Sequence, residues 1–167
     1  YANWQSKPDK RPDLYGCSRT EIASRWEKSA YQQASLGTLL HRSIERYYNG
    51  MRPLYTKELT REWGQFQTFR DECNPDAYRT EMPLYSYVHQ VGGTVDMIAG
   101  NPDNTFSLYD WKRTKNDLYS YYAGQGATEY GPHPLQSIPN NKAGRHAMQL
   151  NLYRTILESE YGLRIKK

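Results

Sequence analysis

Cysteine is scarce in this sequence, with only Cys17 and Cys73 among 167 residues. Two thiolates are too few to build a zinc site or an iron–sulfur cluster from cysteine alone, so no such cluster is expected. Nothing in the sequence indicates secretion. Both side chains are therefore predicted to be free thiols in a reducing, intracellular compartment.

Long apolar runs are lacking as well, which argues against a membrane-spanning helix and a membrane partner. Apolar residues make up only 37% of the chain, but sixteen tyrosines and four tryptophans can still form an aromatic-rich core. The length suits one domain. Because the chain begins with a tyrosine, we expect a fragment of a larger protein or complex.

No block of like charges occurs, although the net charge is +4 and the isoelectric point is about 9.0. A modest positive excess favours polyanionic partners, of which nucleic acid is the most common. Basic residues that are spread along the chain are more typical of a binding groove than of a charged tail.

The N-terminal part of the chain predicts helices. Residues 1–17 are polar and contain two prolines, so we expect a flexible leader there. Residues 18–21 have the spacing of a capping box, which predicts a helix that begins at Ser18. Apolar residues at helical spacing between 36 and 47 predict a further helix that ends at Asn49-Gly50, and a third is expected after Thr56.

The middle of the chain predicts strands, because aromatic and β-branched residues replace the helical spacing. Residues 78–91 predict one or two strands. Gly92-Gly93 indicates a turn, residues 94–99 a short strand, and residues 100–104 a hairpin loop. The next strand is expected over residues 105–112.

Residues 116–142 have no clear periodicity and several glycines and prolines, so a long loop is expected. A final helix is predicted over 146–161, and residues 163–167 could begin another strand. This order predicts a single domain over 18–167 with an α/β fold, in which helices flank a central mixed β-sheet.

Asp110-Trp111-Lys112 is the first candidate for chemistry. Side chains alternate along a strand, so Asp110 and Lys112 project to the same side, and the hairpin can bring Asp96 close to Asp110. Two carboxylates and the Trp111 backbone carbonyl offer oxygen ligands suited to Mg²⁺ or Mn²⁺, with Lys112 beside them. The alternative interpretation is that Asp96 caps a turn while Asp110 and Lys112 form a surface ion pair.

Further candidates lie upstream and downstream. His41 and Glu45 are one turn apart on a predicted helix, so His41 could be another metal ligand, or a histidine of the interior. Glu81 could support the metal or be an ordinary strand charge. His146, Gln149 and Tyr153 share one face of the last helix, where they could contact phosphate and bases or simply pack.

Four motifs occur in an order that resembles RecB-like nucleases of the PD-(D/E)XK superfamily. They are His41 in G-T-L-L-H-R-S-I-E, Asp96 in G-G-T-V-D, Asp110–Lys112 in Y-D-W-K, and Gln149–Tyr153 in Q-L-N-L-Y. The resemblance covers residues 36–165. With the stretch 134–139, the last motif also resembles versions carried by large DNA viruses and phages, which implies the cytoplasm or nucleus of a host cell.

The resemblance implies a restriction-endonuclease-like core and metal-dependent hydrolysis of phosphodiester bonds. His41, Asp96, Asp110 and the Trp111 carbonyl would be ligands of one or two Mg²⁺ or Mn²⁺ ions, with Glu81 as a further candidate. The catalytic set would be Lys112, Asp96, Asp110, Gln149 and Tyr153. The family usually continues into a strand after the final helix, so we expect truncation at the C-terminus.

The main hypothesis is a Mg²⁺- or Mn²⁺-dependent deoxyribonuclease that prefers single strands or ends. Basic side chains would hold the phosphate backbone and aromatic ones would stack on bases. The predicted nucleic-acid-binding residues are Arg113, Lys115, Tyr119, Tyr122, Lys142, Arg145 and His146, with Trp111 and Tyr121 as further stacking candidates. Two alternatives stay open, namely an RNA endonuclease of the cap-snatching type and an inactive nucleic-acid-binding module.

Overall fold

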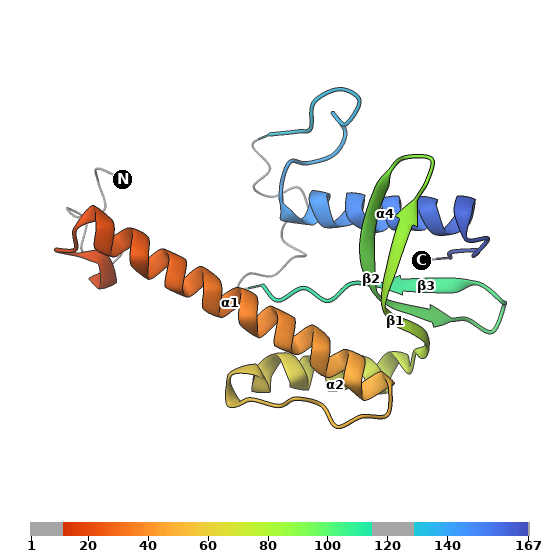
Figure 1. The fold of residues 1–167 in the computed structure, drawn as a ribbon, viewed down its shortest axis with the longest axis horizontal. Coiled ribbons are helices and arrows are strands. Elements are labelled where there is room, and N and C mark those ends of the chain that lie inside the picture. Colours follow the sequence, from red (N-terminus) through yellow and green to blue (C-terminus); the bar gives the residue numbers. More distant parts are fainter. Residues whose placement is uncertain (1–11, 115–128, 167) are drawn as a thin grey trace.

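The computed structural model describes residues 12–114 and 129–166. Within these ranges the fold is mixed α/β, with three α-helices and a three-stranded sheet, which agrees with the predicted class. The elements are η1 (Pro12–Leu14), α1 (Arg19–Tyr48), η2 (Lys57–Leu59), α2 (Thr60–Cys73), β1 (Asp76–Ser86), β2 (Val91–Gly100), β3 (Phe106–Tyr109) and α4 (Lys142–Glu160) (Figure 1).

Helix α1 begins where the capping box predicts. The Ser18 amide donates to Glu21 Oε2 at 2.7 Å, and the Glu21 amide donates to Ser18 Oγ at 3.2 Å. The expectation of two separate helices before residue 50 is wrong, because α1 runs for 30 residues without a break. At 1.5 Å per residue its length is about 45 Å, so its first half extends away from the sheet (Figure 1).

Residues 12–17 differ from the flexible leader expected there. They form η1 and a small cluster in which the buried side chains of Leu14 and Cys17 pack with Ile22 and Trp26 of α1. Residues 1–11 of the expected leader lie outside the described part of the chain. As predicted, Cys17 and Cys73 form no disulfide, and Cys17 is buried whereas Cys73 is exposed.

Helix α2 confirms the helix expected after Thr56 and packs against the second half of α1. The buried cluster is formed by Leu40 and Ile44 of α1 together with Leu59 and Phe66. Aromatic rings surround it, as the composition predicts. The partly buried members of this aromatic cluster are Tyr47, Tyr48, Trp63, Phe69 and Trp111, together with Leu36 and Leu39.

The sheet is an antiparallel meander in the order β1-β2-β3. The hairpin loop between β2 and β3 is confirmed, but the Gly92-Gly93 turn is wrong because both glycines lie inside β2. The turn falls at residues 87–90 instead. Position 93 requires glycine for a steric reason instead, because a Cβ atom there would overlap the Tyr153 ring of α4. Strand β3 ends at Tyr109, three residues earlier than expected.

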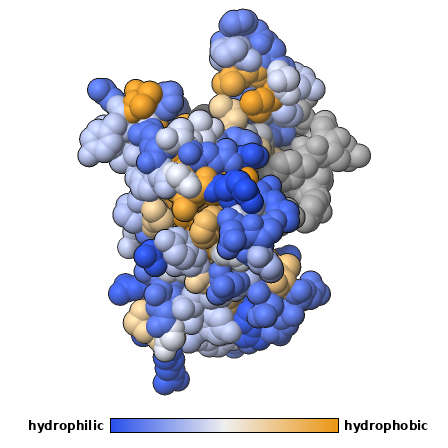
Figure 2. Space-filling model, turned by 90° about the vertical axis from the view of Figure 1, so that its right-hand side faces the viewer, coloured by the Kyte–Doolittle hydropathy of each residue, from blue (hydrophilic) through white to orange (hydrophobic). Residues whose placement is uncertain are grey.

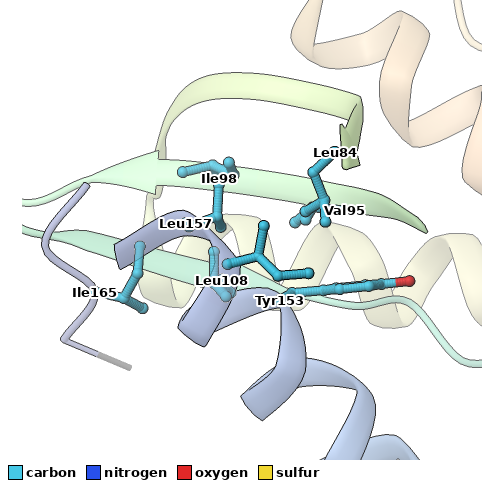
Figure 3. Packing of buried hydrophobic residues seen from close by; sticks show 8 residues of the cluster. Leu84, Val95, Ile98, Leu108, Tyr153, Leu157 and Ile165 are labelled. Atoms are coloured by element: carbon cyan, nitrogen blue, oxygen red, sulfur yellow. The ribbon is translucent and has the colours of Figure 1, made fainter. Parts of the chain in front are cut away.

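Helix α4 covers one face of the sheet. Leu157, Tyr153 and Ile156 pack on Val95, Ile98 and Leu108, with Leu84 and Ile165 completing the cluster (Figure 3). The helix begins at Lys142, four residues before the predicted start, because the Asn141 side chain caps it by accepting from the Gly144 amide at 2.8 Å.

After α4 the chain returns to the sheet. Gly162 has a φ of 69°, a left-handed conformation that ends the helix and favours glycine. Ile165 then forms a parallel bridge with Phe106, in which the Phe106 amide donates to the Arg164 carbonyl and the Lys166 amide to the Phe106 carbonyl, both at 2.8 Å. Of the strand that residues 163–167 could begin, the described residues show one isolated parallel bridge beside β3.

The described surface is largely polar. The face in Figure 2 is mostly hydrophilic, with hydrophobic residues in small groups, in keeping with the mean hydropathy of −0.96. Among the described helices, none combines the length and the apolar character that a bilayer crossing requires.

Glu160, near the end of α4, holds the β1–β2 turn. Its carboxylate accepts from the Ser86 hydroxyl and from the Tyr87 amide at 2.8 Å. The Ser86 hydrogen bond, with those from the backbone, lowers the pKa of Glu160. A carboxyl with a lowered pKa in the folded state stabilises the protein above its unfolded-state pKa, and this contribution is lost as the pH falls through the folded-state value.

We therefore expect Glu160→Gln to lower the free energy of unfolding at pH 7. The difference from wild type should shrink as the pH falls below about 4, near the usual glutamate pKa. Urea unfolding followed by circular dichroism at a series of pH values would measure it. Glu27→Gln, at an exposed position on α1, is the control. A difference that persists unchanged at low pH would contradict the prediction.

Candidate metal centre

Three potential ligands from three elements meet beside the sheet. They are His41 of α1, Glu81 of β1 and Asp96 of β2, whose ligand atoms lie within 4.8 Å of one another. His41 Nδ1 is 3.4 Å from Asp96 Oδ2 and 3.6 Å from Glu81 Oε1. Asp96 is 8% exposed and the other two are half-buried, so water competes little with an ion there.

The strand register brings the two carboxylates together. Thr80 pairs with Met97 and Met82 pairs with Val95, so Glu81 and Asp96 lie between these two pairs on neighbouring strands. Glu81 has a φ of 45°, a left-handed conformation that is uncommon outside glycine and costs about 1 kcal/mol. Such conformations persist only where the surroundings impose them, and they occur often at functional sites.

Strand β2 is irregular at the same place. Val95 and Ile98 both belong to the core cluster with α4, although they are three positions apart and regular alternation would put them on opposite faces. The alternation is therefore interrupted next to Asp96, opposite the left-handed Glu81. This distortion lets Asp96 stay beside His41 while residues on both sides of it contribute to the core.

Helix α1 is tied to β1 close to the site. The Asn49 side chain donates to Thr80 Oγ1 at 2.9 Å, which links the C-terminal end of α1 to the residue before Glu81. His41 lies about two turns earlier on the same helix. This hydrogen bond therefore helps to fix the position of His41 relative to the two carboxylates.

Asp96 also binds the segment that follows β3. Its Oδ2 accepts a hydrogen bond from the Trp111 amide at 2.6 Å. The β2–β3 pairing ends with Met97 and Tyr109. The bond from the Trp111 amide brings the backbone next to Asp110 to Asp96, and the approach of the Asp96 and Asp110 carboxylates stays a prediction.

Asp110 itself is bound to Lys112. Lys112 Nζ lies 2.7 Å from Asp110 Oδ1, and the Asp110 side chain is only 6% exposed. Asp110 was predicted to be a metal ligand, but it does not belong to the three-residue group. The second carboxylate of that group is Glu81. The ion pair is largely buried, unlike the surface ion pair of the alternative interpretation.

Charge and burial shift the protonation of two members of the group. A hydrogen bond to Asp96 raises the pKa of His41, and the charges of Asp96 and Glu81 and a hydrogen bond to the Trp111 backbone add to this against the opposing effect of burial. Burial raises the pKa of Glu81, and the charges of Asp96 and Glu45 raise it further. The negative charge of neighbouring carboxylates contributes to both shifts, and a bound cation would offset that charge.

The distances from His41 Nδ1 to the two carboxylates are compatible with a shared divalent ion. Around an ion with ligand bonds of about 2.1 Å, adjacent ligand atoms lie about 3.0 Å apart and opposite ones about 4.2 Å apart. The two distances from His41 Nδ1, 3.4 Å and 3.6 Å, fall between these values. The two carboxylates are ligands typical of Mg²⁺, Ca²⁺ and Mn²⁺, whereas the imidazole is typical of transition metals.

Helix α4 carries three of the predicted site residues, His146, Gln149 and Tyr153. Gln149 Nε2 donates to Tyr153 Oη at 2.9 Å. Tyr153 is buried in the core against Gly93. Its ring therefore packs in the interior, as the alternative interpretation expected, and is not available to stack on bases. Burial lowers the pKa of His146, and the nearby positive charge of Lys112 lowers it further, which locates His146 near the Asp110–Lys112 pair.

The predicted nucleic-acid-binding residues have different surroundings. Lys142 and Arg145 are exposed in the first turn of α4. The Trp111 ring is partly buried and packs against the aromatic cluster, which favours packing over stacking on bases for this ring. Arg113 contacts Gln33 and Glu62. Four further candidates, Lys115, Tyr119, Tyr121 and Tyr122, lie outside the described residues.

Sequence reasoning missed Glu62 and Gln33, and it identified Asn49 only as the end of a helix. Each of the three contacts a residue far away in the chain, and its local sequence does not indicate that partner. The comparisons with known proteins add no candidate, because no family model, no curated protein and no solved structure matches the chain.

Proposed function

We propose that this protein is a metal-dependent nuclease that hydrolyses phosphodiester bonds, of the RecB-like branch of the PD-(D/E)XK superfamily. The observation that carries the proposal is the convergence of His41, Glu81 and Asp96 beside the Asp110–Lys112 pair. Ligands and a lysine so close together are what phosphodiester hydrolysis requires.

The order of elements supports the same proposal. In the described residues, helices α1 and α2, an antiparallel meander of three strands, helix α4 and an isolated parallel bridge to β3 follow one another. A restriction-endonuclease-like core has helices around a mixed sheet, and this order is compatible with it. The catalytic residues would lie on the meander and on the segment that follows β3, with His41 supplied by α1.

Each residue has a distinct task in the proposed reaction. His41, Glu81 and Asp96 would hold Mg²⁺ or Mn²⁺, with Asp110 and the Trp111 carbonyl as neighbouring oxygen donors. Such an ion polarises a phosphate and lowers the pKa of a bound water. Lys112 would hold a non-bridging phosphate oxygen, and Asp110 keeps its ammonium group oriented.

DNA is the proposed substrate, because the Gln149 and Tyr153 positions match the motif of the RecB-like branch. Exposed Lys142 and Arg145 would contact the phosphate backbone near the start of α4. The RNA endonuclease of the cap-snatching type is the second candidate, favoured by a histidine together with carboxylates in the ligand set.

Cleavage of labelled single-stranded DNA, double-stranded DNA and RNA tests the proposal, with Mn²⁺, Mg²⁺ or EDTA. We expect cleavage that needs the metal and falls by about 10²- to 10³-fold in Lys112→Ala, because a group that stabilises developing charge is lost. Lys28→Ala, an exposed lysine of α1, is the matched control and should retain wild-type activity.

The substrate that is cut decides between DNA and RNA. Cleavage that persists in EDTA, or that Lys112→Ala leaves unchanged, would contradict the proposed mechanism. A folded protein that binds nucleic acid but cuts none of these substrates would be the inactive binding module instead.

A further inference from the structure

Residues 110–113 carry two charged groups of the candidate site on a segment that no strand supports. Strand β3 ends at Tyr109, and residues 110–114 have no regular secondary structure. A catalytic group has to be held to within about 0.5 Å of its productive position. Without ladder hydrogen bonds, side-chain contacts have to supply this precision.

Alternate residues of the segment point to different partners. Asp110 and Lys112 bind each other. The Trp111 ring packs instead on α2, with ring centroids 5.8 Å from Phe66 and 5.2 Å from Phe69. One side of the segment is therefore anchored to the helices, and the other side presents the charged pair.

Arg113, two residues after Trp111, also contacts the helices. Its Nε lies 2.7 Å from Glu62 Oε1 on α2, and its Nη1 donates to Gln33 Oε1 on α1. The Arg113 and Glu62 side chains are only 20% and 18% exposed, so solvent screens their attraction weakly. The Nε contact is an ion pair by distance without the geometry of a hydrogen bond.

We propose that Glu62 and Arg113 are a positioning pair, which holds the segment so that Lys112 and the Trp111 amide stay in register with Asp96. Arg113 is then not a phosphate-binding residue, because its guanidinium group is occupied by Glu62 and Gln33. The effect on catalysis rests on the proposed nuclease function, whereas the effect on the segment does not.

Hydrogen exchange of the Trp111 amide measures the position of the segment directly, since this amide donates to Asp96 at 2.6 Å. In Glu62→Gln we expect this amide to exchange about tenfold faster, because a charged, partly buried contact is lost. The matched control is Glu58→Gln, an exposed glutamate in η2, and its Trp111 amide should exchange like that of the wild type. Arg113→Lys is a milder second variant, which keeps the charge but loses the forked contacts, and should also exchange faster.

Single-turnover cleavage and DNA affinity separate positioning from phosphate binding. A positioning pair predicts that Glu62→Gln lowers the cleavage rate by about 10- to 100-fold and leaves the Kd for DNA unchanged. A phosphate contact predicts that Arg113→Lys weakens binding and that Glu62→Gln leaves the rate unchanged. That second pattern, or wild-type exchange of the Trp111 amide in both variants, would overturn the proposal.

The two proposals fail in different ways. If the wild-type protein cuts no nucleic acid, the proposed function is wrong, while faster Trp111 exchange in Glu62→Gln still supports the positioning of the segment. If the wild type cuts and Glu62→Gln matches it in rate and exchange, the positioning pair is wrong and the nuclease stands.

Discussion

Asp96→Asn is expected to reduce metal-dependent cleavage by at least about a thousandfold. Asparagine has the same shape and keeps an oxygen that can accept the Trp111 amide proton, which Asp96 Oδ2 binds at 2.6 Å. The substitution therefore removes the charge and leaves the packing almost unchanged. A divalent ion would lose the most buried of its three ligands.

Single-turnover rates over a range of Mn²⁺ concentrations, together with calorimetric titration of Mn²⁺, would measure this effect. Asp71→Asn is the matched control, because Asp71 is exposed and pairs with Arg70 on the surface of α2. It should bind metal and cut like wild type. Near-normal cleavage by the Asp96 variant would show that the proposed ligand set is wrong.

Phe66→Ala is expected to lower the free energy of unfolding by about 3–5 kcal/mol, the usual cost of removing a buried phenylalanine. Phe66 is 4% exposed and lies at the centre of the aromatic cluster. Its ring centroid is 5.5 Å from Tyr47, 5.0 Å from Trp63 and 5.8 Å from Trp111. The variant therefore loosens the anchor of the Trp111 ring as well as the packing of α1 on α2.

Urea unfolding followed by circular dichroism would give the change in free energy. Tyr31→Ala is the control, since this aromatic ring on α1 is 76% exposed and its loss should change stability by less than about 0.5 kcal/mol. Equal costs for the two variants would mean that the aromatic cluster contributes little to stability.

Local patterns predict the parts of the fold that depend on neighbours in sequence. The capping box gives the start of α1, and the spacing of Leu59 and Phe66 gives α2. The polar stretch in the middle of α1 has no apolar periodicity, which is why one long helix looked like two. Its residues keep the helical conformation because nothing among them, neither proline nor a capping pattern, interrupts it.

Contacts between distant residues could not be predicted in this way. Gly93 looked like part of a turn, whereas its small size serves the Tyr153 ring, sixty residues later in the chain. Glu62 of α2 forms an ion pair with Arg113 of the segment after β3, and the residues next to either one in sequence do not indicate this contact.

The candidate site was predictable in part. The hairpin predicts that Asp96 and Asp110 lie near each other, and the resemblance adds His41. Glu81 enters the ligand group through a left-handed conformation that its sequence context does not indicate. Asp110 and Lys112 form an ion pair, in keeping with the expectation from strand alternation that their side chains project to the same side.

The ligand group is assembled from positions 41, 81 and 96, which only the native chain brings together. An unfolded chain would have to close long loops to recreate it, so an ion that binds here binds the folded state alone. Ion binding then raises the free energy of unfolding, by about 2.7 kcal/mol at an ion concentration one hundred times the Kd. The thermal unfolding midpoint should accordingly rise with Mn²⁺ concentration, which makes ion binding measurable without any substrate.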